Sequence, residues 1–66
     1  MRDSEIKQSM VDFIENDKIV TVTLDNGIWC SVDVIDDIMD DSFFGIDKDG
    51  EEEEYYFSEV VELVSI

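Results

Sequence analysis

The chain has 66 residues and a formal charge of −15, because 19 acidic residues stand against four basic ones and histidine is absent. Solubility alone requires a net charge with a magnitude of only about 2–8. Like charges at the density of this chain destabilise a compact state. The composition still excludes a disordered tail, since 44% of the residues are apolar, 11% are aromatic and proline is absent. We therefore expect a single folded domain over residues 1–66 whose charge serves a function.

An amphipathic helix is predicted over residues 4–15. Ile6, Met10, Phe13 and Ile14 recur at the spacing of one helical face. Asp3 or Ser4 can cap its first turn. Because a helix this short is unstable alone, it is expected to pack on the rest of the domain.

The hydrophobic period changes to two over residues 18–24, which predicts a strand. Asn26-Gly27 follows, and this dipeptide is a strong hairpin signal between two strands. The return strand is expected over residues 28–35. Its apolar face carries Ile28, Cys30, Val32 and Val34.

Residues 36–41 read as a turn or a bent strand end. Three further strands are expected at residues 42–47, 52–57 and 61–66, separated by a tight turn at Lys48-Asp49-Gly50 and a single helical turn at Ser58-Glu59. Gly45 indicates a bulge or a close backbone approach within its strand.

One helix followed by five short antiparallel strands predicts a mainly β fold. Such meanders close into small barrels, which removes exposed sheet edges. The helix is expected over one opening of the barrel. The expected core residues are Ile6, Met10, Phe13, Ile14, Val20, Val22, Leu24, Cys30, Val32, Val34, Phe43, Ile46, Phe57, Val61 and Leu63.

The order and local pattern resemble the Sm-like and SH3-like small barrels. The likeness rests on the helix, the Val20–Gly27 hairpin, the acidic turn after Val34, the Asp49-Gly50 hairpin and the closing segment Phe57–Val64. The Sm family implies RNA binding in a ring. This sequence departs from that pattern, because RNA binding needs cationic side chains on the phosphates and the chain has almost none. Direct nucleic-acid binding is therefore not expected.

Enzymatic chemistry is not expected either. No histidine is available as a base, and Cys30 lies among apolar residues, where a free cysteine usually acts as a small core residue. Asp47-x-Asp49-Gly50 is similar to the middle of an EF-hand loop, but the first and twelfth positions then fall on Gly45 and Tyr56, which cannot supply the required oxygen ligands. We predict no metal site and no cofactor.

Half of the 22 residues from Asp33 to Glu54 are acidic, and only Lys48 offsets them. On one face of a strand, alternate residues lie about 6.6 Å apart, and phosphates in nucleic acid are spaced on the same scale of a few ångströms. Such carboxylates can imitate a phosphate backbone. The residues predicted to bind a partner are Asp33, Asp36, Asp37, Asp40, Asp41, Asp47, Asp49, Glu51, Glu52, Glu53 and Glu54.

The favoured function is a non-enzymatic, phage-type inhibitor that mimics DNA and occupies the basic nucleic-acid surface of a host protein. Its targets are expected among restriction enzymes, CRISPR effectors, nucleoid proteins and polymerases. No segment is apolar enough for a membrane span or a signal peptide, so the cytoplasm of a host bacterial cell is the expected location.

Two other functions stay open. An adaptor module would bind a protein through an edge strand or through Trp29, Phe44, Tyr55 and Tyr56, and an immunity protein would neutralise one nuclease toxin. Whether Trp29, Tyr55 and Tyr56 belong to the core or to an interface is also open. So is a homodimer formed through edge strands.

Overall fold

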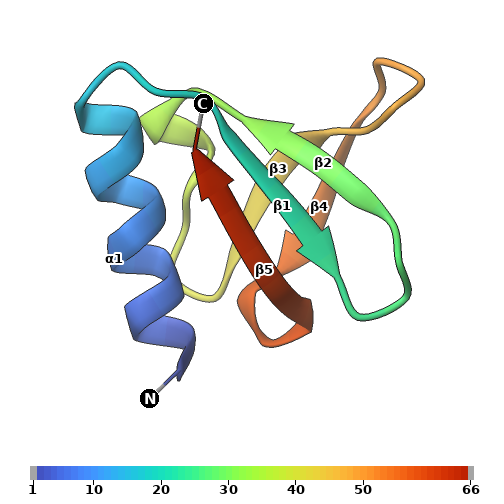
Figure 1. Cartoon of the computed structure of the whole chain (residues 1–66), viewed down its shortest axis with the longest axis horizontal. Coiled ribbons are helices and arrows are strands. Elements are labelled where there is room, and N and C mark those ends of the chain that lie inside the picture. Colours follow the sequence, from blue (N-terminus) through green and yellow to red (C-terminus); the bar gives the residue numbers. More distant parts are fainter. Residues whose placement is uncertain (1, 66) are drawn as a thin grey trace.

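The computed structural model describes residues 2–65, which form a helix, five strands and two short 3-10 helices (Figure 1). In chain order these are α1 (Arg2–Glu15), β1 (Val20–Leu24), β2 (Trp29–Val32), η1 (Ile35–Asp37), β3 (Ser42–Ile46), β4 (Glu52–Tyr56), η2 (Phe57–Glu59) and β5 (Val60–Ser65). The strands form one antiparallel sheet in the order β4-β3-β2-β1-β5. The predicted mainly β class with an N-terminal helix is confirmed.

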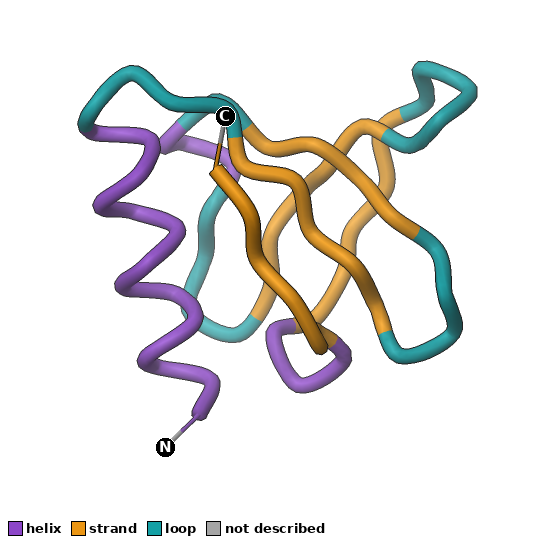
Figure 2. Tube along the Cα trace, viewed as in Figure 1, coloured by secondary structure: helices purple, strands orange, loops and turns teal. Residues whose placement is uncertain are grey.

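The predicted elements differ from the observed ones at their ends. The strand expected at residues 28–35 is the most shortened, because β2 ends at Val32 and the chain then turns into η1. Ile66, which the prediction placed in the last strand, lies outside the described residues. The outer strands of the sheet are β4 and β5, joined by η2 (Figure 2). These pairings do not establish closure into a barrel, which stays a prediction.

The helix packs with its apolar face on β1, β5 and both 3-10 helices. Met10 is fully buried, and Ile6, Phe13 and Ile14 pack against the core, as the spacing predicted. The helix ends where Asp17 takes a left-handed conformation, with φ 62°. The amides of Asp17 and Lys18 then donate to the carbonyls of Ile14 and Phe13, which is a Schellman ending. No helix among residues 2–65 is long and apolar enough to cross a membrane.

The core lies between the inner face of the sheet and α1. Its buried hydrophobic residues are Met10, Val20, Val22, Leu24, Cys30, Val32, Phe43, Tyr55, Phe57 and Val60. Phe43 sits at its centre, with ring centroids 5.9 Å from Tyr55 and 5.1 Å from Phe57. These spacings are typical of favourable aromatic contacts, so the three rings form a packed cluster.

The prediction of Val61 as a core residue is wrong, and Val60 takes its place. Glu62 pairs with Thr23 and Val60 pairs with Leu24, so Val61 is the extra residue of a β-bulge. The bulge shifts the alternation by one residue. Val60 is therefore buried while Val61 is 56% exposed.

The prediction is also wrong for Val34 and Ile46, which are exposed. Val34 lies beyond the end of β2, where the chain has left the sheet. Phe43 faces inward, so two-residue alternation turns Gly45 inward and Ile46 outward. The sequence pattern had placed both Phe43 and Ile46 inside, which one regular strand cannot do.

Gly45 marks a close approach between β3 and β2. A β-carbon added at Gly45 lies 2.6 Å from Cys30 Sγ and 3.0 Å from Cys30 Cβ. Only a residue without a side chain fits at this distance. Glycine thereby lets Cys30 fill the inner face of the sheet opposite β3.

Candidate functional site

The structure divides the eleven predicted partner-binding acids into two groups. The first, termed the β2–β3 acidic segment, contains Asp33, Asp36, Asp37, Asp40 and Asp41. The second, termed the acidic hairpin, contains Asp47, Asp49, Glu51, Glu52, Glu53 and Glu54. Figure 1 shows the β2–β3 segment beside α1 and the β3–β4 hairpin on the opposite side of the sheet. The acids of η1 and those at the tip of the hairpin therefore stand on different sides of the sheet, whereas Glu54 reaches Ser42, which directly follows Asp41.

The β2–β3 acidic segment is held by η1 and by α1. Asp36 and Asp37 lie in the turn of η1, which contacts the helix. The Nζ atom of Lys7 on α1 lies 3.5 Å from Oδ1 of Asp40. The Asp40 side chain is fully exposed, so water screens this pair and it contributes little to stability.

The tip of the acidic hairpin is fixed by its own first carboxylate. Asp47 Oδ1 accepts hydrogen bonds from the backbone amides of Asp49, at 2.9 Å, and Glu51, at 3.0 Å. Gly50 closes the three-residue loop with φ 81°, a conformation that glycine adopts without strain. The tip is therefore an ordered turn that presents charge from fixed positions.

The two faces of β4 present their carboxylates in different directions. Glu52 and Glu54 pair opposite Ile46 and Phe44, on the outer face. Glu54 Oε2 also accepts a hydrogen bond of 2.7 Å from the hydroxyl of the buried Ser42. Glu53 pairs opposite Gly45 and points to the inner side of the sheet. Glu52 and Glu54 thus lie on the outer surface of the sheet, and Glu53 lies on the inner one.

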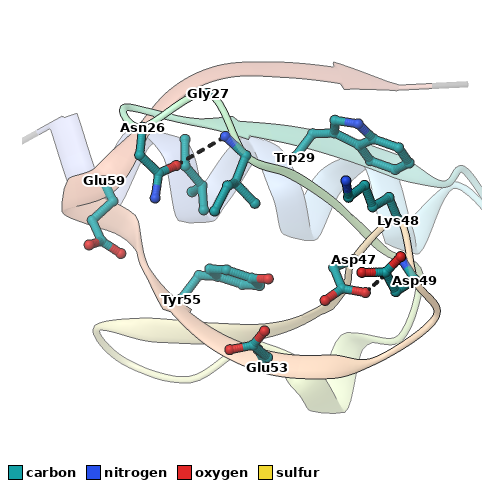
Figure 3. A pocket seen from close by; sticks show the side chains of 11 residues that line it. Asn26, Gly27, Trp29, Asp47, Lys48, Asp49, Glu53, Tyr55 and Glu59 are labelled. Carbon is teal, nitrogen blue, oxygen red and sulfur yellow. Dashed lines mark hydrogen bonds between the residues drawn. The ribbon is translucent and has the colours of Figure 1, made fainter.

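Between the tips of the two hairpins lies a pocket with a volume of about 600 Å³ (Figure 3). This volume lies in the range of small-molecule sites. Its lining residues are Leu24, Asn26, Gly27, Ile28, Trp29, Asp47, Lys48, Asp49, Glu53, Tyr55 and Glu59. The pocket therefore joins part of the predicted acidic set to apolar and aromatic walls.

The first hairpin supplies the wall of the pocket opposite the acids. Its loop has the same three-residue form as the second, closed by Gly27 with φ 85°. Asn26 Oδ1 accepts a hydrogen bond of 3.0 Å from the amide of Ile28, which fixes the loop. The Asp25 amide donates to the Glu59 carbonyl at 2.8 Å and ties this loop to η2. Both sides of the pocket are thus built on ordered turns.

Tyr55 lies at the inner end of the pocket. Its ring is buried in the core against Phe43, and Figure 3 shows its hydroxyl pointing into the cavity. Burial raises the pKa of Tyr55, and charge on Cys30 when its thiol is ionised, on Glu53 and on Asp47 raises it further. The hydroxyl therefore keeps its proton at neutral pH and can both donate and accept a hydrogen bond.

The aromatic residues left open by the sequence fall into two classes. Tyr55 belongs to the core, while Trp29 and Tyr56 are 45% and 51% exposed. Trp29 also borders a shallow outer groove with Thr21, Thr23, Gly27 and Ser31. β1 and β2 carry no charged residue, so this groove is an uncharged strip on an acidic protein.

Metal-ligand groupings and the single thiol were the remaining chemical features to place. Residues 2–65 contain no cluster of three or more histidine, cysteine, aspartate or glutamate side chains arranged to hold a metal ion. Burial, and after it the charge of Asp47, raises the pKa of the Cys30 thiol to about 11. A thiol of this kind stays protonated and is a weak nucleophile.

Comparison of the chain with protein-family models, with curated protein sequences and with solved structures finds no match. The candidate site therefore rests on the chain's own geometry. Sequence reasoning assigned Asn26, Gly27 and Glu59 to no site, and it named Tyr55 only as a possible binding residue of an adaptor. The Asn26-Gly27 and Asp49-Gly50 turn signals were visible, but the approach of the two turns depends on how the sheet coils.

Proposed function

We propose that this chain is a non-enzymatic binding protein that occupies the basic nucleic-acid surface of another protein by presenting carboxylates in place of phosphates. Its targets are nucleic-acid-binding proteins of a bacterial host, such as restriction enzymes, CRISPR effectors, nucleoid proteins or polymerases. The proposal extends to a nuclease toxin, in which case the chain acts as an immunity protein.

The observation that carries this proposal is the lack of internal compensation for the charge. Among the described side chains, the Lys7–Asp40 contact is the single salt bridge. The acidic hairpin has no ion pair within residues 2–65, although its carboxylates stand on ordered backbone. An unpaired and fixed negative surface repels itself, and a basic partner relieves that repulsion.

The spacing of the carboxylates also supports this proposal. Glu52 and Glu54 share one face of β4, where alternate residues lie about 6.6 Å apart. The charges therefore repeat on the scale of a nucleic-acid strand. Because the second acidic group lies across the sheet, a partner can contact one group or wrap around both.

The test is binding to purified basic nucleic-acid-binding proteins of the host, measured by calorimetry over a series of salt concentrations. The affinity should fall steeply as salt rises, and duplex DNA should compete for the same site. A tight complex with a single nuclease assigns the immunity role. An affinity that does not change with salt, or a complex that DNA cannot displace, contradicts phosphate mimicry.

Two variants with equal charge show which acidic group makes the contact. Glu51–Glu54→Gln neutralises four acids of the hairpin, and Asp33, Asp36, Asp37 and Asp41→Asn neutralises four of the β2–β3 segment. Both variants carry −11. If the carboxylates are the interface, at least one variant weakens binding by more than tenfold. If both variants bind like the parent chain, the charge is not the interface.

The uncharged outer groove supports a second candidate, an adaptor that binds a protein through Trp29. An exposed tryptophan is a frequent anchor of protein interfaces. Trp29→Ala should then abolish binding, whereas salt and Glu51–Glu54→Gln leave it unchanged. Phosphate mimicry predicts the opposite pattern, so one set of variants separates the two functions.

A further inference from the structure

The pocket between the two hairpins combines negative charge with aromatic and apolar walls. Asp47, Asp49, Glu53 and Glu59 line it, and Lys48 is its one basic residue. Figure 3 shows the carboxylates of Asp47, Asp49 and Glu53 on one side of the cavity and the Asn26-Gly27 turn on the other. A cationic group placed between them is therefore faced by several carboxylates at once.

The carboxylates are not fully occupied by the protein. Asp47 uses Oδ1 for the turn amides, and Glu59 Oε1 accepts from the Tyr56 amide at a long 3.4 Å. The Glu53 carboxylate makes no hydrogen bond or ion pair with any described residue. Lys48 forms no salt bridge within the described part of the chain. Acceptor capacity is thus left over inside a concave site.

Tyr55 adds a hydroxyl group to the pocket. Its side chain is 9% exposed, and its hydroxyl points into the pocket without a hydrogen-bond partner among residues 2–65. No buried side-chain nitrogen or oxygen lacks a partner among the described residues, so this hydroxyl is open to water in the pocket and can bond a ligand that replaces the water. Figure 3 shows the hydroxyl on the same side of the pocket as Asp47 and Glu53, so it adds an acceptor to the one that these carboxylates provide.

We propose that this pocket binds a guanidinium group, and that the arginine side chain of a basic partner supplies it. A guanidinium presents five donors in one plane, which suits several carboxylates and the Tyr55 oxygen together. Its weakly hydrated faces stack on aromatic rings, and Trp29 lines the pocket. Leu24 and Ile28 supply apolar surface for the aliphatic stem. A lysine ammonium offers three donors and no plane, so it fits this lining less well.

The inference that a partner's arginine supplies the guanidinium rests on the proposed function, since a protein that mimics DNA contacts basic residues on its partner. The pocket then adds one specific contact to a surface that otherwise acts through charge. Its own chemistry can be tested without the partner. The probes are N-acetyl-arginine amide, N-acetyl-lysine amide and the neutral isostere N-acetyl-citrulline amide.

Binding is followed through backbone amide shifts in NMR spectra and through the fluorescence of Trp29, the only tryptophan of the chain. The arginine probe should give saturable shifts at Asn26–Ile28, Asp47–Asp49 and Glu53–Tyr55. The lysine probe should bind at least threefold more weakly, and the citrulline probe should not saturate. Equal response to the arginine and lysine probes, or shifts spread over both acidic groups, overturns the inference.

Neighbouring residues supply matched control variants. Glu53→Gln should weaken the arginine probe about tenfold, whereas Glu52→Gln, with the same charge on the other face of β4, should change it less than twofold. Tyr55→Phe should weaken it about threefold to fivefold, and Tyr56→Phe should not. Lys48→Gln should strengthen it by removing the competing cation. Equal effects within either matched pair assign the binding to overall charge and overturn a pocket.

The two proposals fail in different ways. If the arginine probe does not bind while DNA still competes with the chain for a basic protein, the pocket inference falls and phosphate mimicry stands. If the probe binds with the expected variant pattern but no nucleic-acid-binding protein is recognised, the pocket stands and phosphate mimicry falls. The amide spectrum of each variant also reports whether it is folded.

Discussion

At Gly45, strand β3 comes close to Cys30 on β2. At Gly27 and Gly50, by contrast, an added β-carbon has no neighbour within 4 Å. The inward position of Gly45 follows from the alternation of β3, and Cys30 fills the space that a side chain would need. Because protein interiors are close-packed, one added methyl group at such a place forces atoms to move. The stability of the central sheet therefore depends on this pair.

Gly45→Ala should lower the free energy of unfolding by about 1–3 kcal/mol, since the new β-carbon overlaps Cys30 Sγ. Urea unfolding of the parent chain, both single variants and the double variant with Cys30→Ala measures this cost. In the Cys30→Ala background the cost should be smaller, because the sulfur is gone. An equal cost in both backgrounds would show that the contact is not the cause.

The buried Cys30 thiol also predicts a pH dependence of stability. Burial raises its pKa from 9.0 to about 11 in the folded chain. Between these values the unfolded chain loses the thiol proton first, so the free energy of unfolding falls as pH rises from about 9 to 11. Below pH 9 the group contributes no dependence. Cys30→Ala should make the decline in this window shallower in urea titrations, and an unchanged slope would contradict the buried, protonated thiol.

Among the elements, β5 shows how a bulge changes which residues reach the core. Regular alternation from Leu63 predicts Val61 inside, whereas the extra residue in the pairing with β1 turns Val60 inward. No local signal such as a glycine marks this bulge, so the sequence could not reveal it. The same applies to the end of β2, where the chain leaves the sheet before Val34 despite continued alternation.

Val60→Ala should lower the free energy of unfolding by about 2 kcal/mol, since it removes two buried methyl groups. Val61→Ala, an identical change one residue further on, should cost less than about 0.5 kcal/mol because its side chain is exposed. Thermal unfolding of both variants checks the register. If Val61→Ala lowers the free energy of unfolding more than Val60→Ala does, the bulge does not lie at Val61.

At the scale of the whole molecule, repulsion between the carboxylates opposes folding. A domain of this size buries only about 60% of its unfolded surface, so its stability margin is small. A net charge of −15 within 25 × 25 × 18 Å adds repulsion that the Lys7–Asp40 contact does not offset. The domain stays folded only if packing in the three-ring cluster and between the helix and the sheet outweighs that repulsion.

Raising salt from about 10 to 500 mM should increase the melting temperature, since the Debye length falls well below the size of the domain. Glu51–Glu54→Gln should raise the melting temperature at low salt and reduce its dependence on salt. Calorimetry of both proteins over the salt series measures these effects. A melting temperature that does not respond to salt would mean that the carboxylates lie too far apart to repel.

The amino-acid pattern alone was enough to predict the fold class, the order of the helix and the five strands, both glycine turns and most of the core. Helical and strand periodicities are local, and burial of one face follows directly from them. The formal charge of −15 also follows from the composition alone. Gly45 stood out because glycine weakens the interior of a strand and is found there mainly at bulges and close backbone approaches.

The positions of the charges relative to one another and to the aromatic residues, by contrast, follow from the folded chain alone. The acidic stretch is one run in the sequence, but the fold places its η1 part beside α1 and the tip of the β3–β4 hairpin on the other side of the sheet. Tyr55 and Tyr56 are adjacent residues of the same type, and strand alternation places Tyr55 in the core and Tyr56 on the surface. The pocket between the hairpins exists because the coiled sheet brings residues 24–29 and 47–53 together. Such distant contacts leave no periodicity in the chain, and so they appear only when it is folded.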